Sequence, residues 1–190
     1  MMKHIFEDKT FKGINFSRKG FVKGEYENCS FENCLFLKTD LANVNFIDCT
    51  FHGCDLSLAK ITDSVFRDNI FKECKLSGLQ FEQCNKILFS ADFEECILNL
   101  SSFNKLSLKK TKFKNCSLQE VDFSECDLSE SLFDNCNLMR AKFERTVLVK
   151  ADFRTSYNYS IDPEINRIKK AKFSTTGIVG LLHKYDIEIE

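Results

Sequence analysis

The sequence predicts a solenoid, a chain that coils repeatedly around its own apolar axis. Phenylalanine recurs in one five-residue frame eleven times between Phe6 and Phe81, and seven more times between Phe93 and Phe153. A five-residue period matches neither the helix nor the strand, so each repeat must turn a corner. A second, mostly small residue precedes each large apolar one by two positions, and the other three positions are mostly polar. Each repeat is therefore expected to bury two side chains and expose three.

The first run of repeats covers residues 6–81. Its large apolar residues, here called centres, are all five positions apart. They are Phe6, Phe11, Phe16, Phe21, Tyr26, Phe31, Phe36, Leu41, Phe46, Phe51, Leu56, Ile61, Phe66, Phe71, Leu76 and Phe81. An uninterrupted series of this kind favours a close-packed apolar column inside a polar skin.

Two additional residues then break the frame over residues 82–88. We expect Leu88 to be the next buried centre, and Ile87 and Phe89 to be exposed beside it. The break is either a bulge that lets the two halves of the solenoid restack, or a contact point for a partner. Beyond it the centres resume as Phe93, Leu98, Phe103, Leu108, Phe113, Leu118, Phe123, Leu128, Phe133, Leu138, Phe143, Leu148 and Phe153.

Every fourth centre indicates four sides and 20 residues per coil. Starting at Phe11, this selection gives eight phenylalanines without exception, ending at Phe153. Two Phe-rich columns alternating with two Leu-rich columns would keep the core volume of each coil nearly constant, as close packing requires. Another 20 residues lead to Phe173, so residues 156–173 are interpreted as a degenerate last coil with centres Asn158, Pro163 and Ile168.

The repeats resemble a known family. Units such as Ala91-Asp92-Phe93, Ala151-Asp152-Phe153 and Cys126-Asp127-Leu128 are similar to those of pentapeptide-repeat proteins. This resemblance implies an all-β solenoid, a right-handed quadrilateral β-helix with four repeats per coil. The expected organisation is then a β-helix over residues 1–173 and a separate tail over residues 174–190.

The tail is expected to form a short helix and a terminal strand. Ser174, Thr175 or Thr176 can cap an amphipathic helix that ends near Lys184, and residues 185–190 alternate between apolar and acidic. Such a tail can cover the open end of the coil, pair with a second copy, or do both. The residues predicted for this cap and dimer interface are Ile178, Leu181, Leu182, Tyr185, Ile187 and Ile189.

The same tail is similar to those of quinolone-resistance pentapeptide-repeat proteins of the Qnr type. That resemblance implies a homodimer and a partner among the type II topoisomerases, DNA gyrase or topoisomerase IV. Two features differ from the Qnr pattern: 27 basic residues nearly balance 28 acidic ones, and the chain has only a two-residue insertion, whereas many Qnr proteins project two longer loops. A structural or adaptor protein that binds some other protein therefore remains the alternative.

Composition argues against several functions. A net charge of −1 supplies no basic field for nucleic acid, so direct nucleic-acid binding is not expected. The sequence has no apolar stretch long enough to span a membrane, and it enters the repeat directly after Met1, so we expect a cytoplasmic protein without membrane contact. His4, His52 and His183 are too far apart to converge, and no catalytic motif occurs, so no enzyme and no cofactor are expected.

The ten cysteines fall in the small-residue phase, if Cys84 is counted in the first frame. We interpret them as buried thiols that act as small apolar residues. Disulfides would be strained between stacked coils, and no metal-binding pair such as C-x2-C occurs, although redox or metal chemistry is the alternative.

Outward positions on two opposite sides carry apolar residues and are candidate partner surfaces. Scattered exposed apolar residues without a function are the alternative. The side with Phe36 and Leu56 has Leu35, Leu37, Leu58, Ile97, Leu100, Met139, Tyr157 and Tyr159. The side opposite has Ile5, Ile47, Val65, Ile87, Phe89, Val147 and Val149.

Overall fold

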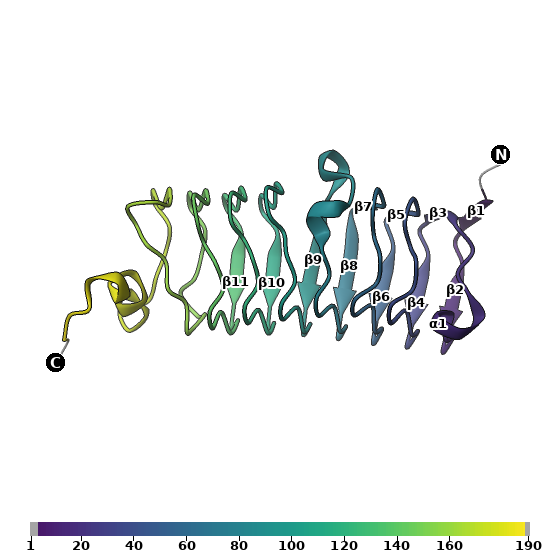
Figure 1. The fold of residues 1–190 in the computed structure, drawn as a ribbon, viewed down its shortest axis with the longest axis horizontal. Coiled ribbons are helices and arrows are strands. Elements are labelled where there is room, and N and C mark those ends of the chain that lie inside the picture. Colours follow the sequence, from purple (N-terminus) through teal and green to yellow (C-terminus); the bar gives the residue numbers. More distant parts are fainter. Residues whose placement is uncertain (1–3, 189–190) are drawn as a thin grey trace.

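The protein is a rod-shaped parallel β-solenoid, as predicted, with the two ends of the chain at opposite ends of the rod (Figure 1). The computed structural model describes residues 4–188, so Ile189 of the predicted tail interface lies outside the described residues. One sheet joins β1 (His4–Glu7), β3 (Gly24–Glu27), β5 (Asn45–Ile47) and β7 (Val65–Arg67). The second joins β2 (Thr10–Lys12), β4 (Ser30–Glu32), β6 (Thr50–His52), β8 (Asn69–Lys72), β9 (Ala91–Glu94), β10 (Lys112–Lys114) and β11 (Leu132–Asp134).

Strand register follows the predicted coil length. Phe51 pairs with Phe71, 20 residues on, and Phe71 pairs with Phe93 across the two-residue insertion. Isolated parallel bridges form the two sides that lack long strands. We number the sides in chain order: side 1 carries the centres from Phe11, side 2 those from Phe16, side 3 those from Phe21, and side 4 those from Phe6.

Aromatic rings fill the axis of the rod. On side 1, nine phenylalanine rings from Phe11 to Phe173 stack with neighbouring centroids 4.6 to 5.5 Å apart. The rings of side 3 meet them edge to face; Phe123, for example, lies 5.8 Å from both Phe113 and Phe133. Phe113 and Phe133 are fully buried. Stacked and edge-to-face rings are the favoured aromatic arrangements, so the pattern of centres accounts for the core.

The corners between sides are tight turns. The Thr39 amide donates to the Phe36 carbonyl (2.8 Å), and the Ala59 amide donates to the Leu56 carbonyl (3.1 Å). The residue before each of these donors has a left-handed backbone, as at Leu58 with φ of 56°. This is the geometry of a type II turn, whose third residue favours Gly or Asn. At the first corner of side 2 a short helix, α1 (Phe16–Lys19), replaces the turn.

The prediction at the insertion was wrong about which residue is buried. Leu88 is 40% exposed, whereas Phe89 is 7% exposed and lies between the rings of Phe81 (5.6 Å) and Phe103 (6.2 Å). The 3-10 helix η1 (Phe81–Gln83) precedes this segment. The larger ring fills the coil, and the 3-10 helix η2 (Lys86–Leu88) projects from the rod beside β7 and β9 (Figure 1).

The last coil and the tail also depart from the predicted pattern. Asn158, a predicted centre, is exposed, and the neighbouring Tyr159 is buried in its place. The tail forms two 3-10 helices, η3 (Gly177–Leu181) and η4 (His183–Tyr185), in place of the expected α-helix. Residues 186–188 form no strand, so the described part of the expected terminal strand is absent.

Candidate protein-interaction surfaces

The interior of the rod holds thiols that are buried and protonated. All ten cysteines are free and buried, and all but the Cys84 thiol donate to backbone carbonyls of the neighbouring coil, as from Cys54 to Phe31 (3.2 Å). Burial raises the pKa of the Cys49, Cys84 and Cys126 thiols to about 12, so these groups stay protonated at neutral pH. Within residues 4–188, no group of three or more His, Cys, Asp or Glu could hold a metal ion.

Side 2 carries a row of exposed apolar residues, interrupted at the coils of Lys75 and Ser117. Seven of the eight residues expected there are 39 to 60% exposed, and we call them the apolar stripe: Leu35, Leu37, Leu58, Ile97, Leu100, Met139 and Tyr157. Parallel bridges link this side from Leu35 to Tyr157, one residue per coil. The other outward residues of this side are both uncharged and charged. The uncharged ones include Ser57, Ser77, Asn99, Ser117 and Gln119, and the charged ones are Lys38, Asp55, Lys75, Glu120 and Arg140.

Two turn positions in the stripe are unusual. Leu58 and Leu100 adopt positive φ, at 56° and 62°, and are the only apolar side chains that do so among the described residues. A Cβ at Gly78 would lie 2.5 Å from Leu58 Cδ2, so the Leu58 side chain lies over Gly78 of the next coil. Glycine at position 78 therefore makes room for an exposed leucine.

Four other predicted surface residues are not available for contact. Tyr159 and Phe89 are buried, and Ile47 and Val65 are each 7% exposed. The Phe89 ring packs between Phe81 and Phe103, and the Tyr159 ring packs against Phe153, Phe173 and the tail, which the outward phase alone does not reveal. On side 4, Ile87 is 93% exposed on the η2 projection, and its predicted exposure is therefore confirmed.

Charge is segregated along side 4. Its first coils expose Glu7, Asp8, Glu27, Asp48 and Asp68 beside one base, Arg67. Its later coils expose Lys109, Lys110, Lys150, Arg167, Lys169 and Lys170, and Asp127 and Glu130 pair with two of these lysines. Elsewhere charges of opposite sign alternate and pair between coils, as where Lys72 and Lys114 flank Glu94 at 3.7 and 3.2 Å. The acidic surface thus covers only one half of one side of the rod.

The tail docks on the last coil. The Ile161 amide donates to the Gly180 carbonyl (2.9 Å), and the Lys184 ammonium contacts carboxylates of Asp162 and Glu164, each at 2.7 Å. The Tyr185 hydroxyl donates to Glu164 (2.9 Å). Leu181 packs against the core, and Leu182 is half-buried, whereas Ile178, Tyr185 and Ile187 are about half exposed. The tail caps the coil and still presents apolar side chains to solvent.

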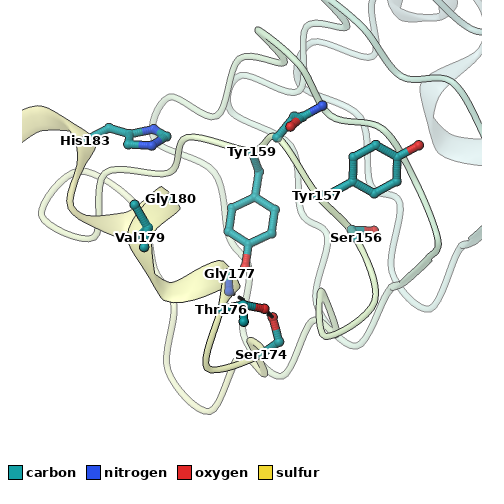
Figure 2. A pocket seen from close by; sticks show the side chains of 10 residues that line it. Ser156, Tyr157, Tyr159, Ser174, Thr176, Gly177, Val179, Gly180 and His183 are labelled. Carbon is teal, nitrogen blue, oxygen red and sulfur yellow. Dashed lines mark hydrogen bonds between the residues drawn. The ribbon is translucent and has the colours of Figure 1, made fainter. Parts of the chain in front are cut away.

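A crevice lies between the last coil and the tail (Figure 2). Its volume is about 250 Å³, and Tyr157, Tyr159, Thr176 and His183 line it. The buried Tyr159 hydroxyl points toward Gly177 and Ser174 and has no hydrogen-bond partner in the described structure. The crevice is a by-product of docking a glycine-containing segment against a tyrosine.

Coils of 20 residues, an axis of stacked phenylalanines and type II corners define a pentapeptide-repeat solenoid. The sequence model for the pentapeptide repeat region matches residues 24–89 and 86–157, and the chain belongs to the pentapeptide-repeat family. None of the helices in the described residues is both long and apolar enough to cross a membrane.

Solved structures of similar fold include QnrB1, a plasmid-mediated fluoroquinolone resistance protein. A trypsin-treated variant of QnrB1 matches with a TM-score of 0.55 and 17% identity, over 98% of this chain and 92% of that one. Full-length QnrB1 has a TM-score of 0.41 and 19% identity, over 97% and 100% of the two chains. HetL, involved in heterocyst differentiation in the cyanobacterium Nostoc, has a TM-score of 0.31 and 11% identity, over 90% and 86%. No curated protein sequence matches significantly.

Proposed function

We propose that the protein is a non-enzymatic rod that binds a protein partner along the apolar stripe. The observation that carries this proposal is the pair Leu58 and Leu100. A left-handed backbone disfavours a residue with a branched side chain, and exposure to water disfavours an apolar one. Folding therefore gains little from leucine at these two corners beyond the contact of Leu58 with Gly78, whereas a partner that covers them would bury both.

The length of the stripe fits an elongated partner segment such as a helix. Leu35 and Tyr157 are six coils apart, which is roughly 30 Å at about 4.8 Å per layer. A helix of about 20 residues has this length. Apolar contacts at the centre, with polar and charged side chains around them, are the usual arrangement of a protein interface.

A second candidate function is modulation of a type II topoisomerase such as DNA gyrase. The resemblance to Qnr-type proteins suggests it, and the acidic first coils of side 4 favour contact with a basic surface. Because the later coils of the same side are basic, we rank this candidate below a partner on the apolar stripe.

We further propose that two copies associate through their tails. Ile178, Tyr185 and Ile187 remain exposed after the tail has docked, and they lie at the end of the rod, where a twofold axis could pair them. We expect truncation after Phe173 to yield a monomer or an aggregate. An unchanged dimer mass in light scattering would contradict this interface. The cytoplasm is the expected compartment, since the ten free thiols suit a reducing environment.

Site-specific photo-crosslinking tests the proposed binding surface. A photoreactive residue at position 58 or 100 should crosslink one defined partner in cells, whereas the same residue at position 70 should not. Ile70 is a matched control because it is 50% exposed and lies on side 1. The proposed role of the apolar stripe would be refuted if neither position 58 nor position 100 gave a crosslink, or if position 70 crosslinked the same partner to the same extent.

Gyrase supercoiling with and without a quinolone tests the second candidate. If micromolar protein neither protects gyrase from the quinolone nor inhibits supercoiling, the topoisomerase function is refuted.

A further inference from the structure

A groove runs along the edge of the rod between sides 2 and 3, next to the apolar stripe. Its volume is about 600 Å³, and Leu100 of the stripe forms part of its wall. Glu82, Ser101, Asn104, Glu120 and Asp122 also line it, together with the cations Arg140 and Lys142. These residues come from successive coils, so only the stacking of coils brings them together.

Two buried polar atoms in this groove lack hydrogen-bond partners in the described structure: Glu82 Oε2 and Ser101 Oγ. Other inward hydroxyls are satisfied by the neighbouring coil, as where Ser64 donates to Leu41 (2.7 Å) and Ser156 to Phe133 (2.7 Å). Ser101 is 1% exposed and has no such bond. A buried polar atom without a partner costs free energy, and a carboxylate oxygen costs more. Both atoms therefore call for an external group that donates hydrogen bonds.

Three carboxylates and two cations line the groove, so its acidic groups outnumber its basic ones by one. Glu120 contacts Arg140 (3.9 Å), and Asp122 accepts from the Ser124 amide (2.8 Å), so both carboxylates have local partners. Glu82 has no ion pair within the described residues. No arrangement of ligands for a metal ion occurs in that part of the chain, which favours an organic cation.

Guanidinium fits this environment better than ammonium does. It carries five N–H donors in a planar fork and no acceptor, so it can bond a carboxylate and a hydroxyl together. The aliphatic stem of an arginine would contact Leu100 at the same time. A lysine ammonium is a compact point charge, and it lacks the planar fork of donors that can bond a carboxylate and a hydroxyl together.

We propose that this groove binds an arginine side chain of the protein that lies on the apolar stripe. The identity of that protein rests on the proposed function, whereas recognition of guanidinium by the groove does not. The partner segment then combines apolar residues facing side 2 with one arginine that reaches over the edge to Glu82.

An NMR titration of the ¹⁵N-labelled full chain with ethylguanidinium tests the groove without any partner. We expect saturable shifts at the amides of Glu82, Ser101 and Asn104. Glu82→Gln should weaken binding about tenfold or more, because it removes a charge-assisted hydrogen bond. Ser101→Ala should weaken it less. Glu95→Gln, which alters an exposed carboxylate on side 1, should leave the affinity unchanged.

Three outcomes would overturn the proposal. They are shifts that do not saturate, undiminished binding by folded Glu82→Gln, and equal binding of ethylammonium, which would deny selectivity for guanidinium. A successful titration combined with no crosslinks from positions 58 and 100 would retain the groove and remove the partner on the stripe. Crosslinks from positions 58 and 100 without a titration response would retain the partner on the stripe and remove the guanidinium site in the groove.

Discussion

The register of the coil at the insertion can be tested by removing one side chain at a time. Phe89→Ala should be strongly destabilising, since Phe89 is 7% exposed and meets the rings of Phe81 and Phe103. An aromatic side chain buries about 150–250 Å², so replacing this ring with a methyl group removes on the order of 120 Å² of buried apolar area. At about 25 cal/mol per Å² the loss is about 3 kcal/mol, the low end of the range for Phe→Ala in cores.

Leu88→Ala is the matched control, because the frame of the sequence designates Leu88 as the buried centre. Its side chain is 40% exposed on a projecting helix, so the expected loss is about 1 kcal/mol or less. Urea unfolding followed by far-UV circular dichroism measures both variants, and hydrogen exchange shows whether the loss is confined to nearby coils. A larger loss for Leu88→Ala than for Phe89→Ala would refute the assignment of Phe89 to the core.

Three other predictions concern the tail and the thiols. Gly180→Ala should release the tail, because a Cβ at this position lies 2.4 Å from the Tyr159 carbonyl oxygen, and limited proteolysis should then cleave the tail faster than in the parent chain. The hydrogen bond from Lys184 lowers the pKa of Asp162, so this contact stabilises docking above the unfolded pKa of about 3.9 and is lost as pH falls through the lower folded value. NMR signals of a docked tail that persist unchanged at pH 2 would contradict this. With a pKa of about 12, Cys49 should react with iodoacetamide at pH 8 about a thousandfold more slowly than in urea, and a comparable rate would show that the thiol is accessible and ionised.

Much of the candidate surface could be predicted from the sequence. The positions of Leu35, Ile97 and Met139 follow from the five-residue frame, because most outward positions stay outward while each coil stacks on the last, with Ile47 and Val65 as exceptions. The groove could not be predicted. Ser101 occupies an ordinary small-residue position, and only the missing hydrogen bond distinguishes it from Ser64 or Ser156.

The repeat pattern by itself determined the solenoid, the 20-residue coil and the column of rings from Phe11 to Phe173, because phenylalanines at every fourth centre stack on one another when four repeats make one coil. Only the tertiary structure decided at which positions the buried residue departs from the repeat pattern. Phe89 displaces Leu88, and Tyr159 displaces Asn158, since each ring fills space that rings of neighbouring coils leave open. Such a choice depends on contacts between residues far apart in the sequence, and the local frame contains no information about them.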